Sequence, residues 1–141
     1  MILLDTNVVS ALMRPAPSAT VESWLSRQPV AGTFISAITE AELRYGLALL
    51  PAGRRQRQLV AAAEAMLAQD FAGRILPFDS PAAAAYARIA AARRRSGRPI
   101  SQADAQIAAI AASRGASVAT RDAAAFVDCG IGVVDPWHEV S

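Results

Sequence analysis

The sequence predicts an α/β fold in which helices flank a mostly parallel central sheet. Short apolar or β-branched stretches alternate along the chain with longer stretches whose apolar residues recur at helical spacing. The first short stretch, Ile2–Leu4, is continuously apolar, as in a strand that is buried on both faces. A helical pattern follows it directly. Strands that alternate with helices in this way form parallel sheets covered by helices.

The first half of the chain predicts two strands and four helices. Pro15 and Pro17 end the first helix, and turns at 29–32 and 51–53 separate later elements. In chain order we expect a strand over 2–4, a helix from about 8 to 13, a helix over 18–27, a strand over 33–36, and helices over 37–50 and 54–69.

In the second half, small residues and proline mark where elements begin and end. Ser80 is the expected N-cap of a helix that has Pro81 at its first position and ends at Gly97. Ser101 is expected to cap a helix over 102–114, which Gly115 closes. The remaining expected elements are strands over 74–78, 117–119 and 132–134, a short helix over 122–126, and a tail over 136–138.

Composition indicates one globular domain over residues 1–141. The chain is 53% hydrophobic and 18% charged, which excludes a disordered protein. No apolar run approaches the roughly 18 residues of a membrane span, and no signal peptide is present, so the expected location is the cytoplasm. Cys129 is the only cysteine, which excludes an internal disulfide. The formal net charge is only +2, and every basic residue is arginine, so net charge alone does not indicate nucleic-acid binding.

Four acidic residues lie at element boundaries or on first helical turns: Asp5, Glu42, Asp104 and Asp122. Asp5 and Asp122 follow predicted strands, at the sheet edge where open α/β sheets bind ligands. Glu42 and Asp104 can reach the same edge from early turns of the helices that follow Ser36 and Ser101. Carboxylates that gather at one edge repel each other, and a hard divalent cation relieves that repulsion. The chain has no Cys/His set for zinc, so the pattern favours Mg²⁺ or Mn²⁺ and metal-assisted phosphodiester hydrolysis.

The same four residues also suit helix capping, and the pattern leaves this alternative open. Asp5 or Thr6 can cap the first helix, and Asp122 can cap the short one. Ser101-x-x-Asp104 and Thr39-x-x-Glu42 both have the form of a capping box. Each acid taken alone favours a cap, whereas the four taken together favour a metal site.

The motifs around these acids resemble the PIN-domain nucleases, the toxin half of VapBC toxin–antitoxin pairs, and the likeness covers nearly the whole chain. The matching segments are Met1–Asn7, Ala41–Gly46, Ala103–Ala109 and Val118–Asp122. Three further segments are most similar to the FitB-type branch: Ser36–Thr39, Ala72–Phe78 and Asp135–His138.

This resemblance implies a Mg²⁺- or Mn²⁺-dependent endoribonuclease that acts as a type II toxin. By position, Asp5, Glu42, Asp104 and Asp122 would hold the metal and its waters, with Asp5 and Asp104 as the expected direct ligands. Thr6, Asn7 and Thr120 would orient the acids through hydrogen bonds.

The resemblance also implies partners for this chain. A cognate VapB/FitA-like antitoxin and an RNA substrate are expected. A homodimer is expected on a separate ground, the apolar excess of a small domain. Operator DNA is expected to be contacted only through the antitoxin, because the chain shows no DNA-reading motif. Two other interpretations remain. In one, the chain is a FitAB-like regulatory partner with weak or no nuclease activity. In the other, it is a 5′ exonuclease or flap nuclease of related fold, for which the chain is short.

Arginines supply the candidate RNA contacts. Arg93, Arg94, Arg95 and Arg98 lie just before the Asp104 segment, and Arg121 adjoins Asp122. A cationic C-terminal turn is also expected from the helix dipole, so a solvated face is the alternative for the first four. For Arg121, the alternatives are an ion pair with an acid and a plain surface position. His138, the only histidine, and Trp137 are interpreted as tail packing rather than as catalytic groups.

Overall fold

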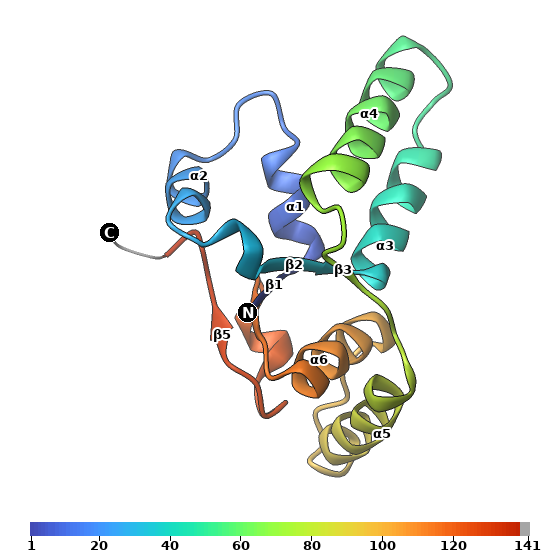
Figure 1. Cartoon of the computed structure of the whole chain (residues 1–141). Coiled ribbons are helices and arrows are strands. Elements are labelled where there is room, and N and C mark those ends of the chain that lie inside the picture. Colours follow the sequence, from blue (N-terminus) through green and yellow to red (C-terminus); the bar gives the residue numbers. More distant parts are fainter. Residues whose placement is uncertain (139–141) are drawn as a thin grey trace.

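The computed structural model describes residues 1–138 and contains a five-stranded sheet whose paired strands are all parallel. The strand order is β3-β2-β1-β4-β5, so the first strand of the chain lies at the centre of the sheet (Figure 1). This confirms the predicted α/β class. The strands are β1 (Ile2–Leu4), β2 (Thr33–Ser36), β3 (Ile75–Leu76), β4 (Ser117–Ala119) and β5 (Val133–Val134).

Helices cover both faces of this sheet because the side chains of each strand alternate between two apolar clusters. Leu3 packs in one cluster with residues of α5 (Ser80–Arg95) and α6 (Gln102–Arg114). Leu4 packs in the other, with residues of α1 (Thr6–Leu12), α2 (Ala19–Ser26) and α3 (Ala37–Ala48). The remaining helix, α4 (Arg54–Ala65), packs beside α3 as the second arm of a helical hairpin (Figure 1). Among residues 1–138, no helix is both long enough and apolar enough to cross a membrane.

Side-chain caps set most helix starts, and one of them differs from the prediction. The Ser101 hydroxyl caps α6, and Gly115 ends that helix with a φ of 66°, as expected. The N-cap of α5, however, is Asp79 rather than Ser80, because the Asp79 carboxylate accepts the Ala82 N–H at 3.1 Å. Ser80 is then the first helical residue, and the proline lies within the first turn.

Three other elements are shorter than predicted. The helix expected over 54–69 is α-helical only to Ala65 and continues as a π-helix over Met66–Asp70. The strand expected over 74–78 is limited to Ile75–Leu76, since the following Pro77 has no N–H to extend the ladder. The short helix expected over 122–126 is a 3₁₀ turn over Ala123–Phe126.

Candidate active site

The carboxyl ends of the central strands open into a pocket of about 410 Å³. Three of the four predicted acids line it, and Asp122 is the predicted acid that does not. Four of its lining residues, Ser10, Ala11, Arg14 and Trp137, were not predicted to belong to the site. The lining consists of Asp5, Thr6, Asn7, Ser10, Ala11, Arg14, Glu42, Asp104, Arg121 and Trp137.

Asp5 lies at the floor of this pocket, where β1 ends and α1 begins. Its side chain is 6% exposed. One carboxylate oxygen, Oδ1, accepts the Thr6 backbone N–H at 2.8 Å, which makes Asp5 the N-cap of α1. The other oxygen, Oδ2, accepts the Thr120 hydroxyl at 2.7 Å and lies 3.4 Å from the amide nitrogen of Asn7. Asp5 therefore caps a helix and faces the pocket at once.

Asn7 and Thr120 connect β1 to the segment that follows β4. The Asn7 amide nitrogen donates to the Thr120 hydroxyl oxygen at 3.2 Å, and its oxygen accepts the Arg121 backbone N–H at 3.1 Å. The Thr120 oxygen also accepts the Asp122 backbone N–H at 3.1 Å. These bonds hold the Asp5 carboxylate in one orientation from residues far apart in sequence.

Glu42 reaches the pocket from α3 and is held there by Thr6, whose hydroxyl donates to its Oε1 at 2.6 Å. The proposed Thr39-x-x-Glu42 capping box does not form. Ser36 caps α3 instead, by accepting the Thr39 N–H at 3.0 Å. The buried Thr39 hydroxyl lies 3.1 Å from that of Thr6 and so supports the same contact.

Asp104 enters the pocket from the first turn of α6. Its backbone N–H donates to the Ser101 hydroxyl at 3.2 Å, which is one half of the expected capping box. Its carboxylate accepts no hydrogen bond from residues 1–138 and forms no ion pair with them. The capping alternative therefore explains the backbone of Asp104 and leaves the carboxylate available to a ligand.

The pocket carboxylates have no ion-pair partner within the described part of the chain, although Arg14 and Arg121 line the same pocket. None of the ion pairs among residues 1–138 includes a predicted site acid. Burial raises the pKa of the Asp5 carboxyl above its usual range. Hydrogen bonds from Thr120 and Thr6 lower this pKa in part, and the nearby carboxylates of Asp104 and Glu42 add to the rise. A cation in the pocket would offset both the cost of burying the Asp5 charge and the repulsion between the carboxylates.

The donor set fits a hydrated magnesium or manganese ion better than a closed protein cage. Within residues 1–138, no three Asp, Glu, His or Cys side chains are already close enough together to enclose an ion. Mg²⁺ keeps several waters and usually binds proteins through one or two carboxylates. Oxygen ligands around an open pocket, without sulfur or imidazole, match that preference.

Comparison with known proteins identifies the family of this chain. Residues 2–128 match the PIN domain family. This chain belongs to the PIN domain family. Toxin FitB of Neisseria gonorrhoeae is 45% identical over 139 residues, which cover 99% of this chain and 100% of FitB. VapC ribonuclease Y4jK of Sinorhizobium fredii is 43% identical, with 98% of this chain and 99% of that protein covered.

Solved structures agree with this assignment over the full length. The crystal structure of FitAcB from Neisseria gonorrhoeae contains a chain with a TM-score of 0.93 and 45% identity, covering 99% of this chain and 100% of its own. A structure of FitAB bound to an IR36 DNA fragment matches with the same TM-score, at 44% identity and with 100% and 99% covered. DNA-bound VapBC from Salmonella typhimurium gives 0.79 at 30% identity, with 96% and 97% covered.

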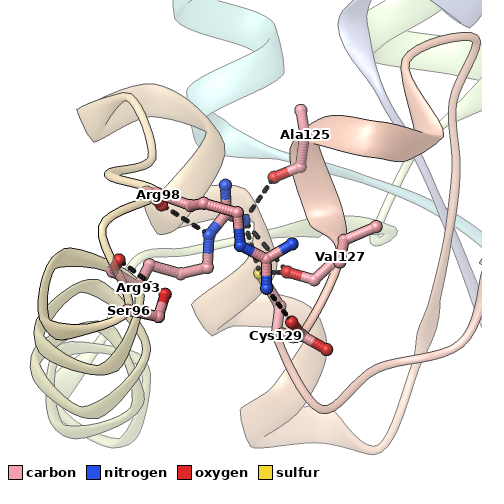
Figure 2. A network of polar contacts seen from close by, with 7 residues as sticks. Arg93, Ser96, Arg98, Ala125, Val127 and Cys129 are labelled. Atoms are coloured by element: carbon pink, nitrogen blue, oxygen red, sulfur yellow. Dashed lines mark hydrogen bonds and ion pairs between the residues drawn. The ribbon is translucent and has the colours of Figure 1, made fainter.

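One predicted RNA contact of this PIN domain is wrong. Arg93 is 7% exposed, and its guanidinium binds backbone carbonyls instead of facing solvent. Its Nε donates to the Arg98 oxygen at 2.7 Å, and its Nη1 donates to the Ala125 and Val127 oxygens at 2.8 and 3.0 Å (Figure 2). We call this arrangement the Arg93 socket. It holds the segment after β4 against the end of α5.

The other predicted arginines differ in their surroundings. Arg98 forms an ion pair with Asp128 on the surface. Arg94 and Arg95 are exposed and do not line the pocket. Arg121 does line it, and its guanidinium carbon lies 4.9 Å from the centre of the Trp137 ring. Of the five predicted RNA contacts, Arg121 is the one that lines the pocket.

Sequence reasoning missed four of the residues that line the pocket: Ser10, Ala11, Arg14 and Trp137. Arg14 follows the last turn of α1, and Asn7, Ser10 and Arg14 recur at spacings of three and four, which places them on one face. That spacing was a usable signal. Trp137 carries no such signal, because its position depends on how the chain after β5 returns to the sheet.

Proposed function

We propose that this PIN domain is the toxin of a FitAB/VapBC-type toxin–antitoxin pair and a metal-dependent endoribonuclease. The observation that carries the proposal is the pocket at the carboxyl end of β1. Three carboxylates from three elements face one open volume there without ion-pair partners among residues 1–138, and arginines line the same wall. The likeness to FitB and to VapC ribonuclease Y4jK over the full chain supports the same activity.

In this mechanism Asp5, Glu42 and Asp104 hold Mg²⁺ or Mn²⁺. The bound ion supplies an activated water and neutralises charge on the phosphate. Thr120 and the Thr6 N–H fix the two oxygens of Asp5, while the Thr6 hydroxyl fixes one oxygen of Glu42. These hydrogen bonds orient the carboxylates before any ligand arrives, which reduces the cost of ordering them in the complex. We retain Asp122 as a fourth candidate ligand, to be tested by comparing metal binding in Asp122→Asn and Asp104→Asn.

We extend the proposal to partners and location. A VapB/FitA-like antitoxin would restrain the chain and carry the contact with operator DNA, as the complexes of FitAB and VapBC with DNA suggest. We propose a homodimer, a single domain over residues 1–141 and residence in the cytoplasm. RNA is the substrate in this account.

A titration of Mg²⁺ or Mn²⁺ into purified, antitoxin-free protein tests the nuclease, with cleavage of total RNA followed on a gel. Glu42→Gln and Glu40→Gln form a matched pair on α3. Glu40 lies two residues from Glu42 but pairs with Arg44 at 2.9 Å and does not line the pocket. We expect metal-dependent fragments from the wild type and Glu40→Gln, and none from Glu42→Gln. Equal cleavage by both variants would show that the pocket is not the active site.

A second candidate is a regulatory partner with weak or no nuclease activity. The likeness to FitB, and to a FitAB structure that is bound to DNA, favours it. Expression without the antitoxin separates the two functions. Growth arrest that Asp104→Asn abolishes supports the nuclease, whereas harmless expression of folded wild-type protein supports the regulatory partner.

A further inference from the structure

Arg121 and Trp137 form a fixed pair on the wall of the active-site pocket. The guanidinium carbon of Arg121 lies 4.9 Å from the centre of the Trp137 ring, within the range of a cation–π contact. Asn7 accepts the Arg121 backbone N–H, and the Asp135 carboxylate accepts the Trp137 N–H at 2.9 Å. Both partners are therefore held at their backbones, and each lines the pocket.

The guanidiniums of the other arginines with partners among residues 1–138 all bind oxygen atoms, including that of Arg74, which also lies over the Phe71 ring. Arg44, Arg98 and Arg114 each pair with a carboxylate, and Arg93 binds carbonyls. Arg121 lines the same pocket as three carboxylates and yet forms no ion pair with any residue from 1 to 138. The indole face of Trp137 gives the Arg121 guanidinium an alternative contact, away from the carboxylates that a metal would need.

We propose that Trp137 is a positioning residue that keeps the Arg121 guanidinium free to bind a phosphate of single-stranded RNA beside the carboxylates. This inference rests on the proposed function, since it assigns a substrate contact in the same pocket. Guanidinium is a planar fork that matches phosphate oxygens in a bidentate manner. Arg14 lines the pocket from the end of α1, so cations from two elements face the site where a phosphate approaches.

Binding of an uncleaved RNA tests this without relying on catalysis. All variants are made in the Asp104→Asn background, and the probe is a fluorescent single-stranded 2′-O-methyl oligoribonucleotide followed by anisotropy over a series of salt concentrations. Arg121→Ala should weaken binding by about tenfold or more, as for a lost charged hydrogen bond. The slope of log affinity against log salt should fall by about 0.7 for one phosphate contact. Arg27→Ala removes an equal charge from the exposed C-cap of α2, outside the pocket, and should leave both values nearly unchanged.

Trp137 is tested through Arg121. Trp137→Leu should weaken binding about two- to fivefold, the range of an exposed cation–π contact, and Trp137→Phe should weaken it less. In Arg121→Ala protein, Trp137→Leu should have no further effect, because its action passes through the arginine. If Trp137→Leu fails to fold, Trp137→Phe takes its place in the double-mutant cycle. Arg121→Lys, which retains the charge without the fork, then takes the place of Arg121→Ala.

The outcomes separate this inference from the nuclease. Additive losses from Arg121→Ala and Trp137→Leu, or losses no larger than that of Arg27→Ala, overturn the inference even when wild-type protein cleaves RNA. Arg121-dependent binding by a wild-type protein that never cleaves RNA supports the inference and overturns the nuclease instead.

Discussion

The active-site pocket and the Arg93 socket handle buried charge in opposite ways. In the socket, one cation is surrounded by three carbonyl oxygens at hydrogen-bond distance. In the pocket, three anions face one open volume, and burial raises the pKa of Asp5. A satisfied charge stabilises the fold, because removing it leaves its partners without donors. An unsatisfied group of like charges costs stability and is retained where a ligand completes it.

The largest expected effect is the loss of the socket. Arg93→Ala leaves three backbone carbonyls without their donor, which should lower the free energy of unfolding by about 3 kcal/mol or more. Urea unfolding followed by circular dichroism measures the change. The control is Arg94→Ala, one residue away and exposed, which should stay within about 0.5 kcal/mol of the wild type. Equal stability of the two variants would contradict a structural role for Arg93.

The pocket should respond in activity rather than in stability. Asp104→Asn removes a carboxylate that makes no hydrogen bond or ion pair with the described residues, so folding should change by less than about 1 kcal/mol. RNA cleavage should fall by roughly a hundredfold or more, because mutating even the residues that hydrogen-bond to a metal ligand lowers metal affinity or activity by about 10–100-fold. Mg²⁺ at 100 times its dissociation constant should stabilise the wild type by about 2.7 kcal/mol and the variant by less. An active variant, or equal stabilisation of both proteins by Mg²⁺, would count against the metal site.

The raised pKa of Asp5 predicts how stability depends on pH. The folded protein holds a proton on Asp5 to higher pH than the unfolded chain does, because burial raises the pKa. The contribution of Asp5 to the free energy of unfolding therefore falls as pH rises from about 3.9 through the raised pKa. At pH values above the raised pKa, the protein carries the full cost of the buried charge.

Asp5→Asn should remove that slope. The amide also replaces the oxygen that accepts from Thr120, so the slope with pH is the diagnostic quantity rather than the overall offset. Chemical unfolding without divalent metal, measured from acid to neutral pH, compares the two proteins. Parallel pH curves would mean that Asp5 does not carry the buried charge.

The smallest expected effect lies at the edge of the socket. Arg98 contributes its backbone oxygen to the socket, whereas its guanidinium only pairs with Asp128 at the surface. Arg98→Ala keeps the carbonyl and should cost at most about 1 kcal/mol, as exposed ion pairs do. RNA binding should not change. A loss comparable to that of Arg93→Ala would show that the side chain of Arg98, rather than its carbonyl, supports the socket.

Local signals were sufficient for the sheet, for most helices and for three acids at one edge. The apolar run at 2–4 and the Ser101/Gly115 boundaries are determined by neighbouring residues, so the sequence predicts them directly. Asp79 and Ser80 are both good caps, and only the folded contact with the Ala82 N–H distinguishes them.

Arg93 shows a signal that was present but overlooked. It falls on the buried stripe of α5 with Ala82, Ala85 and Ile89, whereas Arg94 and Arg95 fall outside it. An arginine on an apolar stripe needs internal partners, which its helix alone does not supply. Trp137, by contrast, reaches the pocket through packing between distant segments, and the pattern of its own segment does not contain that information.

The hydrogen bond between Asp5 and Thr120 joins residues 115 positions apart, and this separation has a consequence during protein synthesis. A ribosome adds Asp5 early and Thr120 on the order of ten seconds later, because it adds about 5–20 residues per second. Until then β1 lacks β4, and the Asp5 carboxylate has no hydroxyl to orient it. The nascent chain therefore cannot orient the carboxylate of the proposed metal site until synthesis has passed Thr120.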